Sequence, residues 1–78
     1  MARLNPVSGK KMMKILQILG FELARVKGSH HFLFNPVSKK TASVPIHSNE
    51  SLGIGLLKAI LRDVDVSVEE FERLRRKV

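Results

Sequence analysis

Cysteine is absent from this 78-residue sequence, and acidic side chains are few. Without cysteine the chain has no disulfide bond, no zinc–thiolate site and no thiol redox chemistry. A signal peptide and a long apolar run are also missing, so we expect a soluble cytoplasmic protein. A chain of this length has room for one hydrophobic core, and residues 1–78 are therefore expected to form a single domain.

The shortage of acidic residues leaves a strong positive charge. Seven Asp and Glu residues oppose fourteen Lys and Arg residues, and the formal net charge is +7. In so small a chain this balance favours a polyanionic partner, of which nucleic acid is the commonest. A membrane surface or an acidic protein would also match the charge.

Hydrophobic periodicity predicts a helix first. The spacing of apolar residues indicates a helix over residues 9–19, with Ser8 as its N-cap and Gly20 as its C-terminal cap. Its outer side carries Lys10, Lys11 and Lys14, which fit a solvated face somewhat better than a set of phosphate contacts.

The period then changes to two, which is typical of strands. Residues 21–27 and 30–34 are predicted to pair through a two-residue turn at Gly28-Ser29. A longer turn over residues 35–40 leads to a third strand over residues 41–46, where Pro45 indicates a sheet edge.

A helical period returns after His47. The apolar stripe of the expected second helix consists of Leu52, Leu56, Leu57, Ile60 and Leu61, and Ser48, Asn49 or Ser51 is its expected cap. The sequence Ser67-Val68-Glu69-Glu70 is a capping box for a short last helix. The predicted order is thus helix, three-stranded antiparallel sheet, helix and short helix, an α+β fold.

The short turn determines how the first two strands pair. Lys27 is expected opposite His30, Arg25 opposite Phe32, and Leu23 opposite Phe34. Alternation then places His30 on a face with the phenylalanines, which are expected to reach the core, and with Arg25 and Lys27 near the turn. His31 points to the other face with Leu33, where strand packing is its expected role.

Two histidines on opposite faces of a strand cannot hold one small ion. The sequence therefore predicts no metal site and no cofactor. Because the third strand runs back antiparallel, His47 and a helix N-terminus are expected near His30, Lys27 and Arg25. Three roles are open for His47: an RNA contact, which we favour, a proton donor to the leaving oxygen, or a residue that ends the strand.

This corner has the groups that RNA cleavage requires. A neutral imidazole at His30 can act as a general base, and neighbouring cations can hold the scissile phosphate. RNA supplies its own nucleophile, the 2′-hydroxyl, so no metal is needed for this route. We assign His30 as the catalytic residue and Arg25, Lys27, Ser29 and His47 as RNA-binding residues.

Several motifs together resemble the HicA family of toxins. They are Gly28-Ser29-His30-His31, Val44-Pro45-Ile46-His47, Gly55-x-Leu57-x-x-Ile60-Leu61-Arg62 and Ser67-x-Glu69-Glu70-Phe71. The resemblance implies a double-stranded-RNA-binding-domain-like fold and an mRNA interferase of a type II toxin–antitoxin system. It also implies that His30 is the catalytic residue and that a HicB-type antitoxin is the partner.

Two other functions would fit the same residues. A non-catalytic module that binds double-stranded RNA would use its lysines on phosphates without any chemistry. A small adaptor that binds an acidic protein is the third hypothesis. The histidine among cations at the edge of the sheet favours the nuclease.

Overall fold

The computed structural model describes residues 4–47 and 50–78, which form three helices and two antiparallel sheets. The helices are α1 (Gly9–Ile18), α2 (Ile54–Asp63) and α3 (Val68–Arg75). The larger sheet has the order β2-β3-β4, formed by Glu22–Lys27, His30–Phe34 and Thr41–Pro45, and the smaller one pairs β1 (Val7–Ser8) with β5 (Ser51–Leu52). The predicted α+β, double-stranded-RNA-binding-domain-like fold is confirmed.

The two ends of the first helix and the start of the last helix are capped as predicted. The Ser8 hydroxyl accepts the amide hydrogen of Lys11 at 3.2 Å, and the Ser67 hydroxyl accepts that of Glu70 at 3.1 Å. Gly20 has a φ of +100°, the left-handed conformation that ends a helix without steric cost in glycine. These signals work because each needs only residues within one helical turn.

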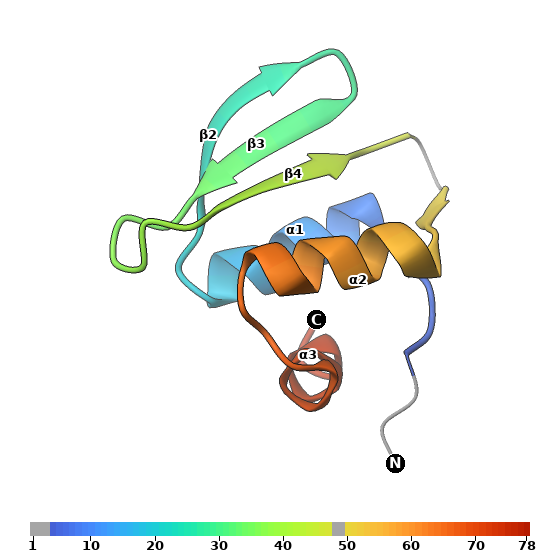
Figure 1. Cartoon of the computed structure of the whole chain (residues 1–78). Coiled ribbons are helices and arrows are strands. Elements are labelled where there is room, and N and C mark those ends of the chain that lie inside the picture. Colours follow the sequence, from blue (N-terminus) through green and yellow to red (C-terminus); the bar gives the residue numbers. More distant parts are fainter. Residues whose placement is uncertain (1–3, 48–49) are drawn as a thin grey trace.

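The elements are stacked in three layers (Figure 1). The three-stranded sheet lies on one side of α1 and α2, and α3 lies on their other side. Among the described residues, fifteen buried hydrophobic side chains fill the spaces between the layers, and Met12, Ile15, Leu16, Leu57 and Phe71 are among the most deeply buried. The helix layer therefore covers only one face of the sheet.

The covered face of the sheet differs from the one expected. Leu33, Ala42 and Val44 are buried toward the helices, whereas Phe34 is 36% exposed and Phe32 is only partly buried. Because side chains alternate along a strand, Phe32 and Phe34 lie on the open face. The prediction that these two phenylalanines reach the core was wrong.

A β-bulge in β2 places Phe21 on the opposite face from Phe32 and Phe34. Lys27 pairs with His30 and Arg25 with Phe32, as predicted, but the register shifts between Leu23 and Arg25. Leu23 therefore pairs with Leu33, and the predicted pairing of Leu23 with Phe34 was wrong. One extra residue reverses the alternation, so Phe21 enters the core while Arg25 stays on the open face.

The second helix begins later than predicted. Gly53 is its N-cap, and Leu52, expected inside the helix, instead pairs with Val7 in the β1–β5 ladder. Ser51 is likewise in β5, while the other two proposed caps, Ser48 and Asn49, fall outside the described residues. Val7 and Leu52 are both buried, so core packing explains the short ladder.

No helix within the described ranges is long and apolar enough to cross a membrane.

Candidate nucleic-acid interface

His30 is the first residue of β3 and lies beside the tight turn at one end of the open face. Its side chain is exposed, and Lys27 stands directly opposite on β2. Gly28 has a φ of +61°, which suits the first position of a two-residue hairpin turn. The turn thus holds an imidazole and an ammonium group on one face, at the end of the sheet where β2 and β3 are joined.

The end of β4 is tied to the same turn. Pro45 pairs with His30, and the amide of Ile46 donates to the carbonyl oxygen of Ser29 at 2.8 Å. His47 follows in an exposed segment, where its carbonyl oxygen accepts the amide hydrogen of Glu50 at 2.8 Å. Pro45 and Ile46 therefore approach the turn as expected, with His47 next in the chain.

The start of α1 also lies at this corner, which was not predicted. A Cβ on Gly9, the first residue of α1, would lie 2.7 Å from the carbonyl oxygen of Pro45. The start of α1 thus packs directly against the end of β4. Only the N-terminus of the second helix was predicted here, and α2 follows β4 and β5 in the chain.

His31 has surroundings unlike those of His30. It pairs with Val26 and Val44, and it is partly buried on the face that the helices cover. Its Nδ1 lies 3.1 Å from the carbonyl oxygen of Ser29. This geometry suits a residue that supports the turn from behind.

Phe32 also contacts predicted site residues, and no role in the site was predicted for it. The guanidinium carbon of Arg25 lies 4.8 Å from the centroid of the Phe32 ring, a cation–π distance. The His30 and Phe32 rings are stacked, with centroids 6.3 Å apart and an interplanar angle of 27°. The period-two spacing of His30 and Phe32 was the signal that could have identified this contact.

The acidic residues gather on another part of the molecule. Five of the seven acidic side chains lie between residues 63 and 72, at the end of α2 and on α3. On α3, Glu70 pairs with Arg73 and Glu72 with Arg75. The helix layer separates α3 from the sheet (Figure 1), so the carboxylates of α3 lie away from the open face.

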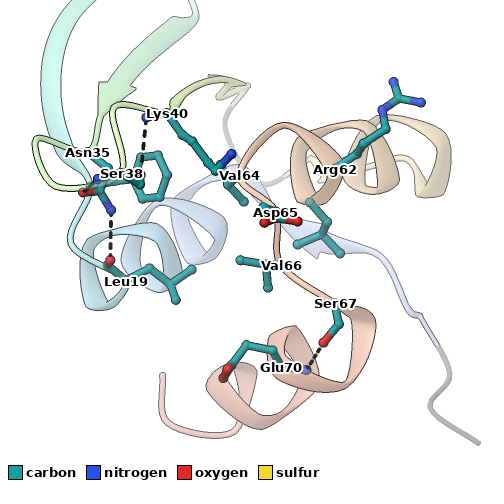
Figure 2. A pocket seen from close by; sticks show the side chains of 12 residues that line it. Leu19, Asn35, Ser38, Lys40, Arg62, Val64, Asp65, Val66, Ser67 and Glu70 are labelled. Atoms are coloured by element: carbon teal, nitrogen blue, oxygen red, sulfur yellow. Dashed lines mark hydrogen bonds between the residues drawn. The ribbon is translucent and has the colours of Figure 1, made fainter.

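A hollow in the surface lies away from the predicted site. Figure 2 shows it between the β3–β4 turn, the end of α2 and the start of α3. Its described lining contains none of the five predicted site residues. Buried Asn35 borders it and donates to the carbonyl oxygen of Leu19 at 3.2 Å, which fastens the turn to the end of α1.

The arrangement at the tight turn can accept a proton and bind a phosphate. An exposed imidazole, an ammonium group and a guanidinium group share one solvent-facing surface, and none of them is engaged in an ion pair within residues 4–47 and 50–78. No group of three potential metal ligands occurs in the part of the chain that the structure describes. Acid–base chemistry on a phosphodiester is therefore available to these side chains.

Comparison with known proteins places the chain in a family. No curated protein matches the sequence. The model of the family described as the HicA toxin of bacterial toxin–antitoxin matches residues 9–66, which include all five predicted site residues. Because this match covers well over half of the sequence, the chain belongs to the HicA family of bacterial toxins.

Proposed function

We propose that this toxin is an endoribonuclease that cleaves mRNA with His30 as its general base. The observation that carries the proposal is the exposed imidazole of His30 on the open face, opposite Lys27 and beside Arg25 and Phe32. Family membership implies an RNA substrate and an antitoxin partner, which agrees with this chemistry.

The proposed reaction begins at the ribose 2′-hydroxyl. A ring nitrogen of His30 takes its proton, and the resulting oxyanion attacks the adjacent phosphorus. The bond from phosphorus to the 5′ oxygen breaks, and this oxygen takes a proton from the imidazolium or from water. The products are a 2′,3′-cyclic phosphate and a free 5′-hydroxyl.

The other predicted site residues bind the RNA in this scheme. Lys27 and Arg25 bind the phosphate and stabilise the charge that develops on its oxygens. Ser29 and His47, at the same end of the sheet, are proposed to contact the RNA backbone. The route requires no metal because the nucleophile belongs to the substrate.

The decisive test compares His30→Ala with wild-type protein in cleavage of a labelled single-stranded RNA. Removal of the general base should lower the rate by about 10²–10⁴-fold. His31→Asn is the matched control, since it removes the neighbouring imidazole from the covered face and keeps a hydrogen-bond donor. Cleavage should persist in excess EDTA, with 2′,3′-cyclic ends on the products.

Three results would contradict the proposal. Full activity of His30→Ala would remove His30 from the mechanism, and a strict need for a divalent cation would remove the metal-independent route. Salt-sensitive binding of duplex RNA without any scission would identify the chain as a non-catalytic RNA-binding module.

The proposed antitoxin is of the HicB type and covers the face that carries His30. Its addition in equimolar amount should abolish cleavage, because it would exclude RNA from this face. Cleavage that persists in a stable toxin–antitoxin complex would show that the antitoxin binds elsewhere.

A further inference from the structure

The open face carries a row of rings along β3. His30, Phe32 and Phe34 occupy every second position of this strand, so their side chains share the uncovered face. Positions two apart repeat about every 6.6–6.8 Å along a strand. The measured separation of the His30 and Phe32 ring centroids, 6.3 Å, agrees with this spacing. We call these three side chains the ring row.

Each member of the ring row has a cation beside it. Lys27 is paired with His30 across the hairpin, and the Arg25 guanidinium lies over the Phe32 ring. At the far end, Nζ of Lys39 lies 6.0 Å from the centroid of the Phe34 ring. Lys39 is held there by the β3–β4 turn, in which its amide donates to the carbonyl oxygen of Asn35 at 2.8 Å. The row thus alternates surfaces for stacking with charges for phosphates.

From this juxtaposition we propose that the ring row binds single-stranded RNA, with successive bases stacked on Phe32 and Phe34. The phosphates lie on Lys27, Arg25 and Lys39, and both stacked bases are on the same side of the phosphodiester bond that is cleaved beside His30. The position of that bond rests on the proposed function, whereas the binding of single strands rests on the row itself.

The spacing of the rings favours an unstacked strand. Neighbouring bases in a helical strand rise by about 3.4 Å, roughly half the repeat of the ring row. Successive bases therefore reach successive rings only after they separate from each other. Bases inside an A-form duplex are stacked and paired, and they cannot lie on a protein ring.

Charge complementarity distinguishes RNA from an apolar partner. Aromatic side chains bind bases of any sequence, and cations along the row fit a backbone with one phosphate per nucleotide.

One carboxylate limits the row at its far end. Glu22 is paired with Phe34 across the β2–β3 ladder. Negative charge at this position opposes a phosphate near Phe34. Glu22→Gln should therefore bind single-stranded RNA more tightly than the parent, by a factor of a few.

The test measures binding without cleavage, in the His30→Ala background, by fluorescence anisotropy of a short labelled RNA without self-complementarity. Phe32→Leu should weaken binding about 5- to 150-fold, the range for loss of one stacked base. Phe32→Tyr should restore it, because the ring is kept. Ile18→Ser, a control at a side chain 51% exposed on α1, should bind like the parent. Thermal unfolding of each variant checks that it is folded.

Several outcomes would overturn the inference. It fails if folded Phe32→Leu binds as tightly as the parent, if duplex RNA competes better than the single strand, or if neither RNA binds at low salt. Cleavage by the wild type is scored separately. If the wild type cleaves RNA but Phe32→Leu binds RNA as tightly as the parent, only the ring-row proposal fails. If RNA binding depends on Phe32 but the wild type does not cleave RNA, only the nuclease proposal fails.

Discussion

Adjacent residues in this chain have opposite surroundings. His30 is exposed on the open face of the sheet, while His31 is partly buried and contacts the carbonyl oxygen of Ser29. The alternation of side chains along β3 causes this separation. The prediction that the two imidazoles cannot share one ion follows from the same alternation, and the strand geometry agrees with it.

Asn35 shows how one buried side chain organises a turn. It is 7% exposed, and its amide nitrogen donates to the carbonyl oxygen of Leu19. Its Oδ1 accepts the amide hydrogens of Val37 at 2.9 Å and Ser38 at 3.1 Å. The turn that carries Lys39 is therefore fastened to the end of α1.

We predict that Asn35→Ala lowers the free energy of unfolding by about 1–3 kcal/mol, because a buried carbonyl group loses its partner. Urea denaturation measures this change. Val37→Ala, at a side chain 91% exposed in the same turn, is the control and should change stability by less than about 0.5 kcal/mol. Equal stability of both variants would show that the Asn35 hydrogen bonds do not hold the turn.

At the scale of elements, the contact between α1 and β4 supports the candidate site. Gly9 is buried at the start of α1, where an added Cβ would lie 2.7 Å from the Pro45 carbonyl oxygen and 2.9 Å from Cγ1 of Ile46. Pro45 in turn pairs with His30. The position of the end of β4, which pairs with His30, therefore depends on the absence of a side chain at Gly9.

We predict that Gly9→Ala destabilises the protein by about 1–3 kcal/mol through overpacking and also slows RNA cleavage. The second effect arises because the end of β4 must move away from α1. Chemical denaturation and the cleavage assay measure the two effects together.

Gly55→Ala is the matched control for this experiment. Gly55 lies in α2 with no atom near its potential Cβ, so alanine there should stabilise the helix by about 0.5–1 kcal/mol. If Gly9→Ala proved as stable as Gly55→Ala, the close packing of α1 on β4 would be disproved.

At the scale of the whole molecule, the acidic residues are concentrated on one side. The formal net charge is +7, yet most of the acidic residues lie at the end of α2 and on α3. The sheet on the other side of the helix layer presents Arg25, Lys27 and Lys39. This distribution directs a polyanion toward the open face.

We predict that binding of single-stranded RNA weakens with salt, with a slope of log K against log salt near −2 for three phosphate contacts. Lys27→Gln should make the slope less steep by about 0.7, because one contact is lost. Arg73→Gln removes the same charge from α3 and should leave the slope unchanged. Identical slopes for the two variants would place the RNA elsewhere on the molecule.

Much of the fold was predictable because its signals are local. Ser8, Gly20 and Ser67 cap helices through contacts within one turn, and Gly28-Ser29 determines the pairing of Lys27 with His30. The family motifs also lie in short segments, and they identified the same family as the comparison.

Other features depended on residues far apart in the sequence. The bulge in β2 and the pairing of Val7 with Leu52 gave no local signal, since both bring apolar side chains to partners in distant elements. The contacts of Phe32 with His30 and Arg25 were missed for a different reason: an aromatic residue in a strand was assumed to face the core.

The sequence by itself determined the order of the elements, the tight turn, the excess of positive charge and the position of His30 beside that turn. Only the tertiary structure decided which face of the sheet is covered. The helices pack on Leu33, Ala42 and Val44, and a one-residue bulge brings Phe21 to that side. An alternating pattern of apolar residues on both faces is compatible with either choice, and packing energy summed over the whole core selects one.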